Sequence, residues 1–150
     1  MLGILAVVVA ASGCTDNTTT NKTYSNNGIS FTYPGDWSEQ NATESSTLAV
    51  VGNDTSGFAL ASTTITNVAT TNQWASNFKA LMKSDGYTFV SGKPRTVDGQ
   101  SGYEVVMQKS GKYTSTTFFV KNSNPYIAAF TFPTNDQQTV DMILNSLKVP

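Results

Sequence analysis

Hydrophobic positions recur at every second residue over most of the chain, which is the period of a half-buried β-strand. Strands of this kind are predicted at residues 29–33, 48–51, 58–66, 87–95, 102–109, 112–121 and 126–132. The turn residues between the later strands, such as Asp98-Gly99 and Ser110-Gly111, are too few for a parallel crossover. Neighbouring strands are therefore expected to be antiparallel.

Two stretches have the helical period instead. The first has apolar residues at i, i+4, i+7 and i+8 and predicts a helix from about Thr71 to Ser84, ended by Asp85-Gly86. The second is predicted to begin near Thr134 or Asn135. The run 126–132 is apolar at odd and even positions, so both of its faces must be covered. The sequence thus predicts an α+β domain with a single antiparallel sheet of about six to seven strands, flanked by two helices on opposite faces.

The first residues have the pattern of an export signal. Leu2 to Ala11 form an apolar run of about ten residues, which is too short to span a bilayer. The following Ala11-Ser12-Gly13-Cys14 resembles the lipobox of prokaryotic lipoproteins, in which the chain is cut before the cysteine and the thiol carries lipid. We expect residues 1–13 to be a signal peptide and Cys14 to be the lipid anchor. The alternative is a free cysteine buried in an N-terminal strand, and the polar tract after Cys14 argues against it.

The tract that follows is rich in Thr and Asn and too poor in apolar residues to pack. We expect residues 14–27 to be the anchor cysteine with its tether, and residues 28–150 to be the folded domain. Four glycosylation sequons begin at Asn17, Asn21, Asn41 and Asn53. Beside a lipobox, they favour the outer face of an archaeal membrane.

Composition excludes several kinds of chemistry. The chain has no histidine, so Ser-His-Asp and Cys-His catalysis and the commonest zinc sites are excluded. Nine basic and ten acidic residues, without a basic run, disfavour nucleic acid as a partner. We expect no cofactor, no bound metal and no catalytic residue.

Carboxylates remain as candidates for acid–base work. Asp98 and Glu104 are the nearest pair, although a turn aspartate and a solvated strand glutamate are the simpler interpretation. Asp136 and Asp141 are expected to satisfy the N-terminal amides and dipole of the last helix. The segment 53–57 lacks the carboxylates of a calcium loop and is interpreted as a turn.

Two tryptophans are candidate binding residues, because indoles stack on sugars and anchor interfaces. Trp74 lies on the apolar stripe of the first helix, so core packing is expected for it. Trp37 follows a turn, and a binding role and core packing both stay open. A strand face with Tyr113, Ser115, Thr117 and Phe119 is either a binding surface or the floor under a helix.

The segment "GISFTYPGDW" (28–37) resembles the opening of PsbP-like domains. The resemblance extends to the middle helix, the hairpin "DGQSGYEVVMQ" (98–108) and the closing "MILNSLKV" (142–149). It implies the Mog1/PsbP-like fold, an antiparallel sheet flanked by helices. The plant photosystem members of that family are extrinsic subunits of a membrane complex, so the resemblance implies docking at a membrane surface. No metal-linked residue of those subunits has a match in this chain.

The favoured function is accordingly a non-enzymatic, lipid-anchored domain on the extracytoplasmic face of the membrane that docks on or stabilises a protein partner. The alternative is a solute- or glycan-binding surface lipoprotein. A hydrolase with two carboxylates comes third.

The anchor assignment is testable by replacing the thiol. The variant Cys14→Ser is expected to fold but to lose lipidation and processing, because the acylated atom is absent. Mass spectrometry of the membrane-purified wild-type protein should find residue 14 first and acylated. An intact Met1 or an unmodified Cys14 would contradict the assignment.

Overall fold

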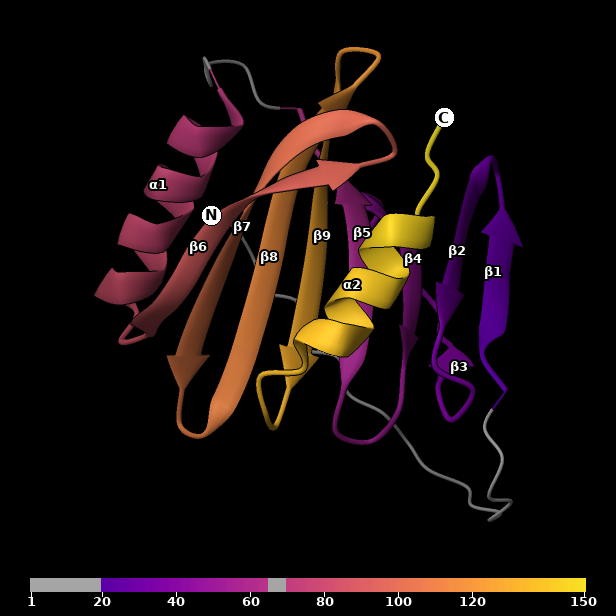
Figure 1. Ribbon diagram of the computed structural model, residues 1–150, viewed down its shortest axis with the longest axis horizontal. Coiled ribbons are helices and arrows are strands. Elements are labelled where there is room, and N and C mark those ends of the chain that lie inside the picture. Colours follow the sequence, from indigo (N-terminus) through magenta and orange to yellow (C-terminus); the bar gives the residue numbers. More distant parts are fainter. Residues whose placement is uncertain (1–19, 65–69) are drawn as a thin grey trace.

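The computed structural model describes residues 20–64 and 70–150. Its centre is an antiparallel sheet of seven strands in the order β3-β4-β5-β9-β8-β7-β6, beside a separate β1–β2 hairpin (Figure 1). The strands are β1 (Lys22–Asn26), β2 (Ile29–Tyr33), β3 (Ser38–Glu39), β4 (Thr47–Gly52), β5 (Gly57–Ser62), β6 (Thr88–Val97), β7 (Gln100–Lys109), β8 (Lys112–Lys121) and β9 (Asn124–Phe132). The helices are α1 (Thr71–Ser84) and α2 (Gln137–Ser146). The predicted fold class is confirmed.

The central strands bury both of their faces. On β8, Phe118 and Phe119 point to opposite sides and are both fully buried. Phe118 joins the core under α1, and Phe119 joins the core under α2 and the β1–β2 hairpin. The two helices therefore cover opposite faces of the sheet, as the apolar pattern of the later strands predicted.

The core under α2 is rich in aromatic side chains. Phe58 contacts Phe31 of the hairpin and Phe130 of β9, with ring centroids 5.0 Å and 4.7 Å apart. Trp37 follows the turn that begins at Pro34, whose carbonyl accepts a hydrogen bond from the Trp37 amide. The Trp37 ring lies 6.2 Å from that of Phe132 and only 3% of the residue is exposed. The turn thus folds the indole into the core.

Helix α1 begins and ends where the sequence predicted. The Thr70 side chain accepts a hydrogen bond from the Gln73 amide at the first turn, and Gly86 takes a positive φ of 86° after the last. Trp74 packs on Phe118 with centroids 4.7 Å apart. The helix lies over β6, β7 and β8, at the left in Figure 1.

The expected tether boundary at Asn27 is wrong. Residues 22–26 form β1, which pairs with β2 along its whole length around an Asn27-Gly28 turn with positive φ at both residues. Tyr24 is the one buried residue of β1 and stacks on Phe31 at 4.9 Å. A single apolar side chain between polar neighbours gave too weak a signal. Cys14 and residues 65–66, the end of one predicted strand, lie outside the described residues.

The C-terminal residues close the domain against the hairpin. Ser30 and Lys148 exchange two backbone hydrogen bonds. Asp98, in the β6–β7 turn, accepts hydrogen bonds from Lys121 Nζ at 2.6 Å and from the Val149 amide at 3.0 Å, and pairs with Lys148 Nζ at 3.0 Å. Burial by itself raises the pKa of Asp98, but these three partners outweigh it and lower the pKa to about 2.

Replacing Trp37 should remove a large part of the stability. The variant Trp37→Ala is expected to lose about 3–5 kcal/mol of unfolding free energy, because it leaves a cavity beside Phe132. Leu81→Ala is the control, since 46% of Leu81 is exposed, and should change it by less than about 1 kcal/mol. Denaturant melts measure both. A similar small change in the two variants would show that the indole contributes little.

The ion pairs of Asp98 predict a loss of stability in acid. Its pKa is about 2 in the folded chain and near 3.9 when unfolded, so the unfolded state binds more protons between these values. This contribution is complete above about pH 4 and is lost as the pH falls towards about 2. Asp98→Asn should be less stable at neutral pH and should have a shallower pH dependence in melts between these limits. An unchanged slope would contradict the assignment.

Candidate functional site

The half of the sheet beside α1 forms the floor of an open groove with a volume of about 1160 Å³. Its floor lies on one face of three adjacent strands, where Ile127 is the one large side chain and the others are small: Ala59 and Ala61 on β5, Ala129 and Thr131 on β9, and Thr114 and Thr116 on β8. Ala129 stands directly between Ala59 and Thr116 in the strand register. Because most of these side chains are short, the surface of the strands is hollowed next to α1.

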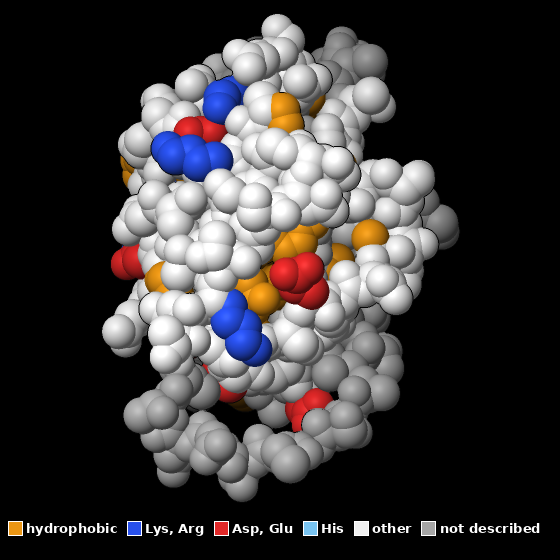
Figure 2. All heavy atoms as spheres, turned by 90° about the vertical axis from the view of Figure 1, so that its right-hand side faces the viewer, with side chains coloured by type: hydrophobic (Ala, Val, Ile, Leu, Met, Phe, Trp, Pro, Cys, Tyr) orange, Lys and Arg blue, Asp and Glu red, His pale blue; other side chains and the backbone are white. Residues whose placement is uncertain are grey.

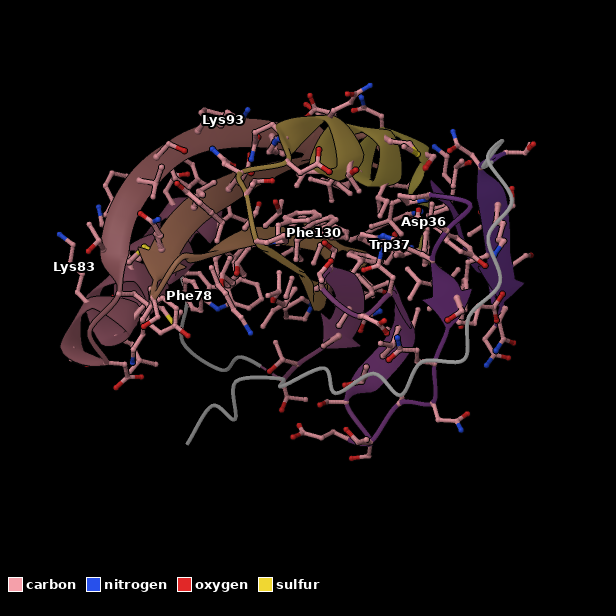
Figure 3. All side chains as sticks on the ribbon, turned by 90° about the horizontal axis from the view of Figure 1, so that it is seen from below. Asp36, Trp37, Phe78, Lys83, Lys93 and Phe130 are labelled. Carbon is pink, nitrogen blue, oxygen red and sulfur yellow. The ribbon has the colours of Figure 1, made fainter. Side chains whose placement is uncertain are left out.

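One wall of the groove is apolar. Phe78 and Met82 of α1 and Tyr87 after it line this wall. Figure 3 shows Phe78 on the side of the sheet opposite α2, whereas Trp37 and Phe130 lie between the sheet and α2. The groove and the aromatic core are therefore on different faces.

Loops close the two ends of the groove. Residues 44–46 and 62–64 lie at one end, and the turns 53–56 and 109–112 lie at the other. Its lining carries many Ser and Thr hydroxyls, with two carboxylates and two lysines: Glu44, Asp54, Lys109 and Lys112. Lys109 Nζ donates to the Asp85 carbonyl and lies 5.0 Å from the centre of the Tyr87 ring. A hydroxyl-lined groove with one apolar wall is suited to binding.

The turn between β4 and β5 is held by Asn53. Its Oδ1 accepts hydrogen bonds from the amides of Thr55 and Ser56, and its Nδ2 donates to Asp36 at 2.9 Å. The turn predicted at 53–57 is confirmed. Asn21 and Asn41 are exposed, Asn53 is partly buried, and Asn17 lies outside the described residues. Glycan attachment at these sequons stays a prediction.

The candidate carboxylate pair is not brought together. Glu104 is fully buried, and its carboxylate accepts hydrogen bonds from Arg95 Nε at 2.7 Å, Ser115 Oγ at 2.6 Å and Gln137 Nε2 at 3.0 Å. Asp98 has a different set of partners, in the turn. Describing Glu104 as solvated was wrong, because β6, β8 and α2 each bring a donor to it. The sequence did contain a signal that Glu104 has a charged partner. A two-residue turn at Asp98-Gly99 sets the register of β6 and β7, and this register places Lys93 opposite Glu104.

Arg95 links this buried carboxylate to α2. Its Nη1 donates to Asp141 at 2.6 Å. Burial lowers the pKa of Arg95, but its hydrogen bonds and ion pairs with Glu104 and Asp141 outweigh burial and raise it. Asp141 therefore pairs with the sheet rather than with the helix N-terminus. Asp136 does have the predicted role, since its Oδ1 accepts from the Thr139 amide.

The aromatic candidates are core residues. Binding through Trp37 would need an exposed indole, so this role is wrong, and Trp74 is buried as expected. Ser115, Thr117 and Phe119 are also buried. The groove uses the other face of β8, with Thr114 and Thr116. Sequence reasoning missed this surface, although small residues at alternate positions of three strands were visible.

Within 20–64 and 70–150, no three His, Cys, Asp or Glu side chains come together as a metal site. Neither α1 nor α2 is long and apolar enough to cross a bilayer.

The fold and the sequence of this chain are both similar to those of known proteins. The solution structure of cyanobacterial PsbP (CyanoP) from Synechocystis sp. PCC 6803 superposes with a TM-score of 0.64 at 14% identity, over 93% of this chain and 98% of that one. A Pseudomonas aeruginosa protein described as a putative regulator of unknown function is less similar, with a TM-score of 0.48 at 10% identity over 79% and 86% of the two chains. No curated protein matches the sequence. The sequence profile of the PsbP-like protein family matches residues 9–149, and the chain therefore belongs to that family.

Proposed function

We propose that this chain is a non-enzymatic binding module, held on the extracytoplasmic face of the membrane by lipid on Cys14, which docks on or stabilises a membrane-associated protein. The groove beside α1 is its docking site. The observation that carries the proposal is a large concave surface whose lining offers hydroxyls and an apolar wall. Membership of the PsbP-like family, which suggests a role in association with a partner, supports it.

The carboxylates support a role without catalysis. Asp98, Glu104 and Asp141 are each engaged in ion pairs with lysine or arginine. Of the two carboxylates that line the groove, Glu44 lies at one end and Asp54 at the other. Acid–base catalysis needs groups within hydrogen-bond reach of the same reacting atoms. The groove has no such pair among the described residues.

The proposed anchor would keep the groove near the membrane. Seven residues separate Cys14 from Lys22, the first residue of β1. Eight residue steps span at most about 27 Å even when fully extended. Confinement of this kind raises the effective concentration of the domain against neighbouring membrane proteins, so a weak interface is sufficient for occupancy.

The groove also favours a second candidate, the solute- or glycan-binding lipoprotein. Its volume is slightly above the usual range of small-molecule sites, so a small ligand fits, and its Ser and Thr hydroxyls are suited to hydrogen bonds with a polar ligand. The apolar wall offers a surface for the ring of a sugar. In this case the ligand would bind the isolated domain tightly, without any membrane partner.

Crosslinking on native membranes tests the docking site. The variant Ala129→Trp fills the centre of the groove floor, and Thr96→Trp is the matched control on exposed β6. We expect the wild type and the control to capture the same specific protein, and Ala129→Trp to reduce the capture at least about tenfold, the effect of losing roughly 1.4 kcal/mol of binding energy. Denaturant melts establish that both variants fold.

Two outcomes would contradict the proposal. Equal capture by Ala129→Trp and wild type would move the docking site away from the groove. Capture of no protein, together with a small molecule that co-purifies with the domain and is lost in Ala129→Trp, would support the second candidate.

A further inference from the structure

The cations of this domain fall into two groups. Lys93, Arg95, Lys121 and Lys148 lie in ion pairs with Asp98, Glu104 or Asp141. Four of the other five lysines lie on the second half of α1 or beside the β7–β8 turn: Lys79, Lys83, Lys109 and Lys112. No ion pair joins these four to an acidic side chain of the described residues. We call this part of the surface the lysine end.

Several contacts bring the lysine end together. Lys109 Nζ, from β7, donates a hydrogen bond to the Asp85 carbonyl just after α1. Lys112 is opposite Lys109 in the register of β7 and β8, beside the turn that joins them. Lys79 Nζ lies 4.8 Å from the centre of the Phe89 ring on β6. Figure 3 shows Lys83 pointing outward on this side of the molecule. In the segments 79–90 and 107–112 four lysines accompany one acidic residue, Asp85, so the lysine end has a net positive charge, with Asp54 of the β4–β5 turn at the same end of the sheet.

Exposed apolar side chains accompany these lysines. Leu81, Phe89 and Val90 are 46%, 38% and 39% exposed, and the remaining large hydrophobic residue exposed to this degree among the described residues is Val120. Exposed phenylalanine and leucine among lysines are typical of protein surfaces that lie in the interface of an anionic membrane. By contrast, the β1–β2 side in Figure 2 has scattered charges of both signs.

We propose that the lysine end rests on the anionic lipid headgroups of the membrane, with its lysines on the phosphates and Leu81 and Phe89 at the level of the headgroups. Lysines near such a surface are each attracted by its negative potential. The first residues of β1 lie at the same end of the molecule in Figure 1, the lower one. This position is compatible with the proposed anchor, and to that extent the inference rests on the proposed function. The strands would then stand upright, with the groove facing sideways.

Vesicle sedimentation tests the inference without a protein partner. Both hydrophobic cores lie between Tyr24 and Val149, so a chain beginning at Thr20 contains the folded domain. We expect it to bind phosphatidylcholine vesicles that contain one-third phosphatidylglycerol, to bind pure phosphatidylcholine far less, and to be released by salt. The double variant Lys83→Gln and Lys112→Gln should weaken binding about thirtyfold. Its control, Lys93→Gln with Lys148→Gln, removes the same charge from two exposed lysines outside the lysine end and should change binding little.

The contribution of the exposed apolar side chains to vesicle binding is tested by two matched variants. Phe89→Ser should weaken binding to the anionic vesicles several-fold. Val120→Ser, which changes a similarly exposed residue on β8 away from the lysine end, should not. Melts of each variant show whether it is folded.

Three results would overturn the inference: equal binding to the two vesicle types, equal loss in the lysine variant and its control, or no binding to either vesicle. The last result would assign the lysine end to an acidic face of a protein. None of them bears on the groove, because crosslinking with Ala129→Trp measures the groove separately.

Discussion

A seven-stranded sheet is too wide for one helix to cover, and the rest of this structure depends on that mismatch. Strands lie about 4.8 Å apart, so the sheet is roughly 30 Å across, whereas a helix with its side chains covers about 10 Å. On one face α2 covers part of the width and the β1–β2 hairpin extends the cover, which gives a continuous aromatic core. On the other face α1 covers β6, β7 and β8. The groove lies beside α1 on β5, β9 and the first half of β8, where most of the side chains are Ala and Thr.

The strands and helices that the sequence predicted are those whose apolar periods are strong. Helix α1 has its predicted bounds because its apolar stripe, Thr70 cap and Gly86 agree with one another. β1 was missed because Tyr24 is its one buried residue. The groove could not be located from sequence for a different reason. β5 and β9 are neighbours in the sheet but lie far apart in the chain, so nothing local shows that Ala59 and Ala129 share one surface.

Buried charge fixes how the second helix sits. Glu104 accepts hydrogen bonds from β6, β8 and α2, and Arg95 continues the network to Asp141. A buried carboxylate without these donors would cost several kcal/mol, so the position of α2 must satisfy them all. The apolar face of α2 specifies that it packs on the sheet, and this network specifies where along the strands it does so. The residue pattern predicted that α2 packs on the sheet and could not predict its position along the strands, since α2 meets β6 and β7 only in the folded chain.

The contact between β2 and residues 146–148 has a consequence for the order in which the domain folds. β2 finds its second set of partners more than a hundred residues further along the chain: Ser30 bonds Lys148, and the Thr32 amide donates to Ser146 Oγ. The edge of β2 is therefore completed, and Phe31 enclosed, after residues 146–148 have been made. Contacts of such long sequence separation form late and slowly. The hairpin and the end of α2 are therefore expected to become ordered together, in one late step of folding.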